Sequence, residues 1–173
     1  MQVHCSEELH LSAAVVAIGA FDGVHKGHQK VIQQMVEESN LQGVPSVVYS
    51  FYPPPRSYFQ GAQVLSSRQE KIDKFHKLGV DYAIIADFTD DYVQRTADLF
   101  INELVNINPL NIIVGEDFRF GNKRAGDLNL LKKYFSVNTI KPVFCSNGER
   151  ISSTRIRELI LQGKADQAIP LLT

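Results

Sequence analysis

Cysteine is scarce in this sequence of 173 residues: Cys5 and Cys145 are the two present, and no Cys-x-x-Cys pattern occurs. A disulfide framework is therefore not expected, and we interpret both as reduced thiols. Long apolar runs are also missing, since none approaches the roughly 20 residues that a membrane-spanning helix needs. The N-terminal segment MQVHCSEELH lacks the basic and then apolar character of a targeting signal. These absences argue against a disulfide-stapled or membrane protein and predict a cytoplasmic one.

An excess of charge of either sign is absent as well. The 18 Lys and Arg residues nearly balance the 19 Asp and Glu residues, giving a net charge of -1, and no basic cluster stands out. Binding to a nucleic acid backbone needs clustered cations, so nucleic acid is not an expected partner. The sequence has no repeat, low-complexity tract or Gly/Ser linker, and 44% of its residues are hydrophobic. Its length then predicts a single domain, residues 1–173, with a substantial core.

Short apolar runs separated by segments of helical periodicity make up most of the chain. The runs predict buried strands at 14–20, 46–51, 82–86, 111–115 and 137–144. The segments between and after them predict helices at 25–38, 68–78, 96–106, 126–135, 153–162 and 165–172. This alternation predicts an α/β fold: a Rossmann-like, doubly wound parallel sheet of five strands. In such a sheet, ligands bind beyond the carboxyl ends of the strands.

The first strand-to-helix turn, GAFDGVHKGH at 19–28, carries the most distinctive pattern. Gly23 permits a sharp turn, and Gly27 is expected to leave room for a ligand beside the backbone. Free N–H groups and the positive end of the helix dipole favour a phosphate there. His25 and His28 share one helix face, so both can face the same phosphate. Neither the phosphate loop of kinases nor the dinucleotide fingerprint is present.

This turn resembles the His-x-Gly-His signature of the nucleotidylyltransferase superfamily. In that superfamily the two histidines contact the nucleotide phosphates and stabilise charge as pyrophosphate leaves. By that resemblance, His25 and His28 are expected to be catalytic.

Four stretches together are similar to the FMN adenylyltransferase module at the N-terminus of prokaryotic bifunctional FAD synthetases. They are IGAFDGVHKGH (18–28), SFYPPPR (50–56), VGEDFRFGNKRAGD (114–127) and ISSTRIRELI (151–160). Their order and spacing match from about residue 14 to residue 172. The resemblance implies the fold of the nucleotidylyltransferase superfamily and one adenylyltransferase domain. The riboflavin kinase domain that follows this module in bifunctional proteins is not expected.

The resemblance also implies that ATP lies between the first turn and the start of the 153–162 helix. Hydroxyls and a guanidinium fork at that helix start can hold phosphates. Arg157 is the expected principal cation, because the family pattern Ser-Ser-Thr-x-Ile-Arg fixes its position, and it joins the two histidines as a catalytic residue. The implied ATP-binding residues are Gly19, Phe21, Asp22, Gly23, His25, His28, Gly115, Asp117, Ser152, Ser153, Thr154 and Arg157.

Two further segments are expected to bind FMN. An isoalloxazine ring needs flat stacking surfaces with a few oriented polar groups, and rigid prolines and aromatic rings supply them. Pro54 departs from the family, which often has histidine there. The implied FMN-binding residues are Phe51, Pro53, Pro55, Arg56, Phe118, Arg119 and Phe120.

The implied reaction is in-line attack of the FMN phosphate on the α-phosphorus of ATP, which gives FAD and pyrophosphate. The attacking phosphate is already ionised, so alignment and charge stabilisation suffice, without a general base or a covalent intermediate. Mg²⁺ is expected to arrive with ATP, and its protein ligands are left unassigned, because no Cys/His/Asp cluster has metal-site spacing. The acidic run Asp87, Asp90 and Asp91 is expected to be a solvated loop or a helix start.

Two alternatives stay open at this point. The His-x-Gly-His turn also permits adenylyl or cytidylyl transfer to another acceptor, such as phosphopantetheine, nicotinamide mononucleotide or glycerol phosphate. A non-catalytic protein that binds flavin nucleotides would keep the same fold.

Overall fold

The computed structural model describes residues 1–6 and 8–173, and its strands form one parallel sheet in the order β1-β4-β3-β2-β5-β6. The apolar runs of the sequence become the central strands, because a parallel strand covered on both faces buries every side chain. In β2 all five residues are buried. The strands are β1 (Gln2–His4), β2 (Ala14–Ile18), β3 (Ser46–Tyr52), β4 (Tyr82–Asp87), β5 (Pro109–Gly115) and β6 (Val137–Ile140).

The predicted α/β fold with a parallel sheet is confirmed, but the prediction of five strands is wrong. The sixth strand is β1, which lies at the edge beside β4, with Val3 opposite Ala83. Its three residues contain no apolar run, so pairing with β4 determines its conformation rather than local sequence. At the other edge β6 ends at Ile140, short of the expected residue 144. Pro142 follows closely and has no N–H to donate to a neighbouring strand.

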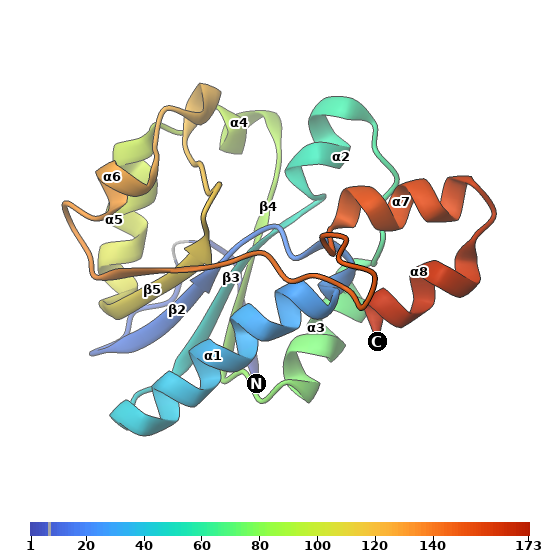
Figure 1. Ribbon diagram of the computed structural model, residues 1–173. Coiled ribbons are helices and arrows are strands. Elements are labelled where there is room, and N and C mark those ends of the chain that lie inside the picture. Colours follow the sequence, from blue (N-terminus) through green and yellow to red (C-terminus); the bar gives the residue numbers. More distant parts are fainter. Residues whose placement is uncertain (7) are drawn as a thin grey trace.

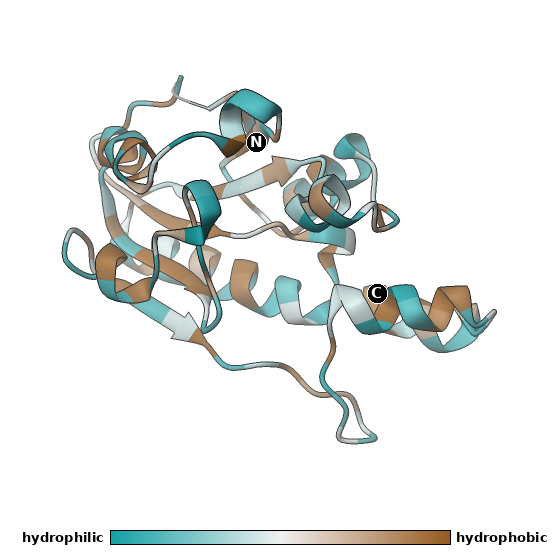
Figure 2. Cartoon of the chain, turned by 90° about the horizontal axis from the view of Figure 1, so that it is seen from above, coloured by the Kyte–Doolittle hydropathy of each residue, from teal (hydrophilic) through white to brown (hydrophobic). Residues whose placement is uncertain are grey.

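Helices cover both faces of the sheet (Figure 1). Neighbouring residues of β2 point to opposite faces, since side chains alternate along a strand. Val15 belongs to the same apolar core as Ile32 and Met35 of α1, while Val16 belongs to the core that includes Leu104 of α5. Figure 2 shows the resulting concentration of hydrophobic residues in the strands. The helices are α1 (Lys26–Gln42), α2 (Pro55–Gln60), α3 (Arg68–Lys77), α4 (Asp90–Val93), α5 (Ala97–Ile107), α6 (Leu128–Leu131), α7 (Ser153–Leu161) and α8 (Ala165–Leu172), with 3-10 turns η1 (Asp22–Val24) and η2 (Asn122–Arg124).

Three helices differ from the expectation. Helices α2 and α4 were not predicted, and α2 begins at Pro55, where the missing N–H of proline costs nothing. The helix predicted at 126–135 is reduced to α6. Gly126 forms a bridge with Phe120, and the Asp127 carboxylate then caps the helix by accepting from the Leu130 N–H at 2.9 Å.

Helices α7 and α8 pack together at one end of the molecule (Figure 1). They surround a small apolar core of their own, which includes Ile151, Ile156 and Leu171. This core holds the start of α7 beside the turn that follows β2. In the described part of the chain, no helix is both long and apolar enough to cross a membrane.

The strand order places a ligand site between β2 and β5. From β2 the chain winds outward through β3 and β4, then returns to the other side of β2 and continues through β5 to β6. The direction of winding therefore changes between β2 and β5. In doubly wound sheets the crevice for ligands lies at the carboxyl ends of the two strands that flank this change.

Candidate active site

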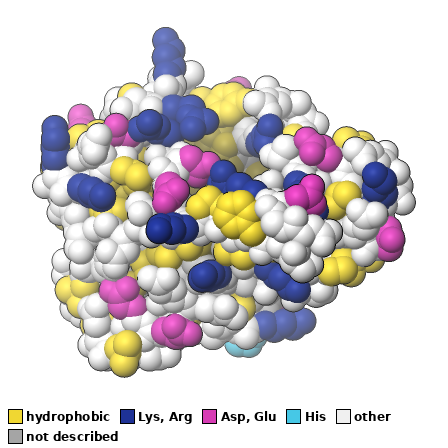
Figure 3. Space-filling model, in the orientation of Figure 1, with side chains coloured by type: hydrophobic (Ala, Val, Ile, Leu, Met, Phe, Trp, Pro, Cys, Tyr) yellow, Lys and Arg dark blue, Asp and Glu magenta, His cyan; other side chains and the backbone are white. Residues whose placement is uncertain are grey.

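A cavity of about 680 Å³ opens where the turn after β2 meets the loop after β5. In the space-filling view, Lys and Arg side chains gather around an apolar area on this upper part of the molecule (Figure 3). Apolar walls with a few charged groups suit a ligand that is part aromatic and part ionic. The cavity is lined by residues of the turn after β2, α2, the segment after β4, the loop after β5 and α7.

The turn after β2 has an unusual backbone. Phe21, Gly23 and Val24 have φ values of 45°, 80° and 46°. Left-handed backbone costs little at glycine, but it is strained for a β-branched residue such as Val24. The Gly23 N–H donates to the Ser66 hydroxyl at 3.0 Å, which helps to hold the turn. Strain that persists because surrounding contacts enforce it is typical of functional sites.

His25 and His28 lie directly after this turn and contact each other. His25 caps α1, because its Nδ1 accepts the His28 backbone N–H at 3.3 Å. The two rings stack with their centroids 3.5 Å apart. A side chain at Gly27 would come within 3.1 Å of the His25 ring. In this structure the space beside Gly27 is occupied by the His25 ring, and the expectation that Gly27 leaves room for a ligand stays a prediction.

Both histidines are neutral near pH 7. The pKa of His25 is lowered from 6.5 to about 4, chiefly by burial and to a lesser extent by the charges of Arg150 and Lys74. The pKa of His28 is held well below 6.5 by burial, and then by His25 and two nearby lysines. A neutral imidazole can donate one hydrogen bond, and His25 carries its proton on Nε2, because its Nδ1 is an acceptor.

Asp22 and Arg157 form a buried ion pair at the floor of the cavity. The Arg157 guanidinium donates to Asp22 Oδ2, and its Nε donates to the Gln63 carbonyl at 2.7 Å. The other carboxylate oxygen of Asp22 accepts from the Leu65 N–H at 3.0 Å. Asp22 and Arg157 were each predicted to bind ATP, and in the structure they contact each other. Their ion pair fixes the turn after β2 against α7. Both also line the cavity.

The start of α7 is fixed by its own hydroxyls. Ser152 caps the helix by accepting from the Arg155 N–H at 3.3 Å, and Ser153 donates to the Asp22 carbonyl at 3.0 Å. Thr154 accepts from the Arg56 guanidinium of α2, on the other side of the cleft. Of these three hydroxyl residues, Ser153 lines the cavity.

The loop after β5 combines stacked rings with ion pairs. Phe118 and Phe120 stack with centroids 5.7 Å apart, and Phe120 is 6% exposed and also packs on Phe100. Phe120 is therefore a core residue as well as part of the cavity wall. Arg119 pairs with Asp127 at 3.1 Å, which holds the guanidinium along the loop.

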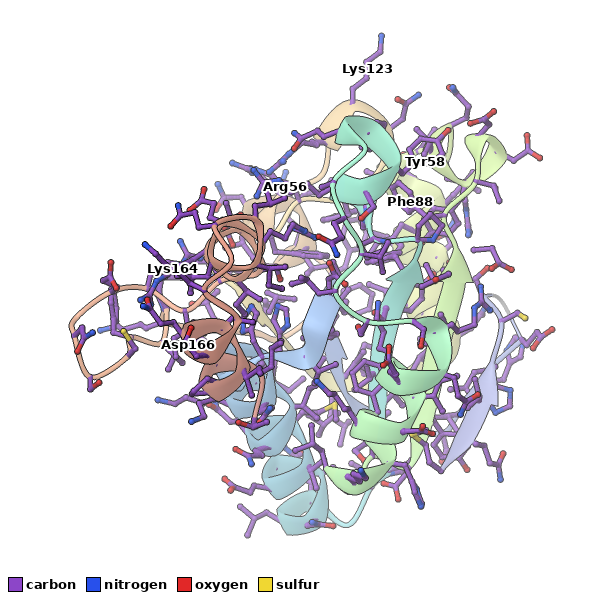
Figure 4. The ribbon with its side chains drawn as sticks, turned by 90° about the vertical axis from the view of Figure 1, so that its right-hand side faces the viewer. Arg56, Tyr58, Phe88, Lys123, Lys164 and Asp166 are labelled. Carbon is purple, nitrogen blue, oxygen red and sulfur yellow. The ribbon has the colours of Figure 1, made fainter. Side chains whose placement is uncertain are left out.

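An aromatic wall stands opposite this loop, and most of it was not predicted. Phe59 of α2 is 62% exposed on the cavity, and Phe88 follows β4. The Tyr58 ring packs edge-on against Phe88, with the ring centroids 5.4 Å apart. Figure 4 labels both residues, together with Arg56. Phe88 could have been predicted to line the site, because it directly follows a strand and ligands bind at the carboxyl ends of the strands in such a sheet.

The predicted site residues separate into two groups. Those that line the cavity are Gly19, Asp22, Phe51, Pro55, Arg56, Asp117, Phe118, Arg119, Phe120, Ser153 and Arg157, and Pro54 joins them. Those outside its lining are Phe21, Gly23, His25, His28, Pro53, Gly115, Ser152 and Thr154. Phe21 is 3% exposed and packs edge-on against Phe75, so in this structure it faces the core rather than the cavity.

Two lysines near the site were missed. Lys71 and Lys74 of α3 donate hydrogen bonds to backbone carbonyls of the turn after β2, at Ala20 and Gly23. Lys71 lies four residues before Phe75 and shares its buried helix face. Lys71 could have been found from the sequence, because it is a lysine on the apolar face of the helix predicted at 68–78.

We searched the described residues for side chains that could hold a metal ion. Within residues 1–6 and 8–173, no three His, Cys, Asp or Glu side chains are grouped so that they could hold one. Of the acidic run, Asp87 pairs with Arg68 and Asp90 begins α4.

A second hollow, of about 540 Å³, lies at the opposite end of the strands. Its one carboxylate, Asp81, accepts from the N–H and the hydroxyl of Ser46 at 2.9 and 2.8 Å. Its lining has a single aromatic residue, Tyr82, and no Lys or Arg, whereas the first cavity has several of each kind and is therefore the candidate active site.

Comparisons with known proteins identify the family to which the chain belongs. The family model described as FAD synthetase matches residues 7–155. A protein of Geobacillus thermodenitrificans named as a bifunctional riboflavin kinase/FMN adenylyltransferase is 51% identical over 99% of this chain and 97% of its own length. Proteins of that name from Haemophilus influenzae and Escherichia coli K12 are each 34% identical, over 94% and 98% of this chain. The chain spans only 56% and 57% of their lengths.

A solved structure has the same fold. A crystal structure of a macrolide-efflux protein from Streptococcus pneumoniae superposes with a TM-score of 0.85 and 29% identity. The superposition covers 99% of this chain and 61% of that chain. The sheet and its helices are thus reproduced in a known protein over nearly the whole of this sequence.

Proposed function

The chain belongs to the FAD synthetase family, and from that premise we propose that its cleft transfers AMP from ATP to FMN, with FAD and pyrophosphate as products. One observation carries the proposal: the cavity has aromatic walls at one side and, at its floor, a strained turn tied to the start of α7. The walls suit a flavin ring, while the turn and helix start suit phosphates. Both halves of the reaction can therefore be held in one cleft.

ATP is proposed to bind along the turn after β2, as its magnesium complex. The phosphates would lie at the N-terminal ends of α1 and α7, where N–H groups and helix dipoles favour negative charge. Ser153 and Arg157 contribute a hydroxyl and a guanidinium edge at the cavity floor. His25 and His28 would donate hydrogen bonds as neutral imidazoles once ATP is bound next to them.

FMN is proposed to stack between the two aromatic walls. Phe51, Phe59 and Phe88 form one wall and Phe118 belongs to the other. Pro55 and Arg56 open α2 at the rim, where a guanidinium can meet the FMN phosphate. This arrangement would place the FMN phosphate facing the α-phosphorus of ATP.

The chemistry needs alignment more than proton transfer. A phosphate oxygen of FMN is already ionised near neutral pH, and it attacks the α-phosphorus as the bond to pyrophosphate breaks. A histidine whose pKa is about 4 is a poor base, which suits a step that needs none. The chain's own contribution is to hold both phosphates in line and to stabilise the charge that develops on them.

The test is direct assay of the purified 173-residue chain. With Mg-ATP and FMN, chromatography should show FAD, and an equal amount of pyrophosphate should form. Phosphopantetheine, nicotinamide mononucleotide and glycerol phosphate, supplied one at a time, should give no adenylylated product. Binding of FMN and ATP without FAD formation would instead support a non-catalytic flavin-nucleotide-binding protein.

Riboflavin phosphorylation is not proposed for these 173 residues. This proposal is supported by the strands of the described residues, which all belong to one sheet. Riboflavin and Mg-ATP should therefore yield no FMN in the same assay. Sustained FMN production would contradict this assignment.

A further inference from the structure

Helix α3 reaches beneath the active-site turn with two lysines. Lys71 is 0% exposed, and its Nζ donates to the carbonyls of Ala20 at 2.8 Å and Phe51 at 3.0 Å. The Ser50 hydroxyl lies 3.3 Å from the same ammonium group. One buried cation therefore joins the ends of β2 and β3, at the floor of the cavity.

Lys74 acts on the other half of the turn. It lies three residues after Lys71, hence on the same side of α3, and donates to the Gly23 carbonyl at 2.7 Å. Ala20 and Phe51 line the cavity, whereas no residue of α3 does. The helix therefore influences the site from behind, through backbone groups.

These hydrogen bonds orient the backbone of the turn. A peptide unit is planar and trans, so its N–H points opposite to its carbonyl. With the Ala20 carbonyl held toward Lys71, the N–H of Phe21 is directed away from α3. Loss of the ammonium group would release this peptide, and with it the strained residues that follow.

The charge of Lys71 has a second effect, beyond its hydrogen bonds to the backbone. Burial lowers the pKa of Lys71 to about 8, while Asp22 opposes that change and Arg68 adds to it. The group is still mainly charged at pH 7, although a buried apolar side chain would avoid the desolvation penalty. A positive charge kept behind an anion-binding turn adds to the favourable potential for phosphates.

We propose that Lys71 and Lys74 are positioning residues for AMP transfer: they fix the turn that carries His25 and His28, and they act through its backbone without contacting substrate. This inference rests on the proposed function. It assigns to α3 a part in the reaction that is separate from substrate binding.

The lysines also influence both histidines through space. Lys74 and Arg150 lower the pKa of His25, and His25, Lys71 and Lys74 lower that of His28. Removing a lysine charge should thus raise the pKa of each histidine that it faces. Loss of the Lys71 charge should act on His28 alone and loss of the Lys74 charge on both histidines, whereas looser packing would relieve the burial of both histidines in either variant.

The experiment compares Lys71→Met and Lys74→Met with Lys77→Met, an exposed lysine of the same helix. We expect kcat for FAD formation to fall by about tenfold or more in the first two, because small misplacements of reacting groups are costly. Histidine signals followed by NMR should titrate at higher pH in the same two variants. Lys77→Met should match the unchanged enzyme in both measurements, and Lys74→Arg should restore activity.

Normal kcat with unchanged histidine titrations in Lys71→Met and Lys74→Met would overturn the inference. If Lys71→Met does not fold, the half-buried Lys74 decides the outcome. The proposed function and the proposed role of the lysines fail in different ways. If the protein without substitutions makes no FAD, the proposed function is refuted. The NMR titrations would still test whether the lysine charges act on the histidines.

Discussion

His28 is a neutral imidazole that stacks on His25 beside the strained turn after β2. We expect His28→Ala to lower kcat for FAD formation by at least about tenfold, since loss of one preorganised donor to a developing charge costs a few kcal/mol of barrier. The measurement is steady-state FAD synthesis, with circular dichroism to confirm folding. His10→Ala, an exposed histidine distant in sequence, is the control. Normal turnover by His28→Ala would remove this residue from the mechanism.

His25 makes stability depend on pH. Its folded pKa of about 4 lies below its ordinary value of 6.5, so the unfolded chain binds a proton that the folded chain does not. The stabilisation is present in full above pH 6.5 and is lost as the pH falls toward 4, by roughly 3 kcal/mol for this group. Urea unfolding across that window should show the loss, and His25→Gln should flatten the slope. An equally steep slope in the variant would assign the effect to other groups.

Asp22 and Arg157 should be strongly coupled in stability. Arg157→Ala leaves a buried carboxylate without its cation, which costs about 3–5 kcal/mol. The same variant should slow FAD synthesis, because the turn loses its tie to α7. Asp22→Asn combined with Arg157→Ala should be less destabilised than the sum of the single changes, when all are measured by denaturant unfolding. Additive effects would mean that the two side chains do not interact as the structure shows them.

At the level of single residues, the sequence indicated which residues belong to the site better than it indicated which of them contact each other. The glycines and histidines of the first turn could be recognised because their pattern is local. The pairing of Asp22 with Arg157 could not, since 135 positions separate them. Lys71 was missed for a related reason: its partners are two carbonyls, which every residue has and no motif records.

Helix α2 contributes Phe59 to the aromatic wall of the cavity, where we propose that the flavin ring stacks. Phe59→Ala should raise the KM for FMN by roughly 2- to 10-fold and the KM for ATP much less, because an aromatic contact is lost in ground and transition states alike. The matched control is Phe144→Ala, which removes a similarly exposed ring, 57% against 62%, from outside the cavity. Equal effects on both substrates would show that α2 shapes the cleft in general. Phe120 is unsuited to this test because its ring is buried in the core.

Short elements were the part of the fold that the sequence did not predict. Strand β1 and helix α4 have three and four residues, too few for a periodic pattern. Helix α2 starts at Pro55 within a proline run, which indicates a turn when it is considered alone. The long central strands and α1, α5, α7 and α8 were predicted within a few residues, because their apolar patterns coincide with the cores on which they pack.

For the whole molecule, topology brings the four sequence motifs together. Two follow β2 and β3, one follows β5, and one opens α7, yet all four contribute residues to a single cavity. The parallel order of the sheet made the general place predictable from sequence. The Asp22–Arg157 ion pair and the position of the histidines outside the cavity lining were not predictable, because they depend on side-chain packing between distant segments.

The central claim is that this cleft moves AMP from ATP to FMN without a covalent intermediate. The most direct measurement supplies ATP radiolabelled at its α-phosphate, together with FMN and Mg²⁺, and follows the label in FAD, in pyrophosphate and on the protein. We predict that the label appears in FAD in step with unlabelled pyrophosphate, and that none remains on the chain. Label retained on the protein, or its transfer to another acceptor while FMN stays unchanged, would contradict the claim.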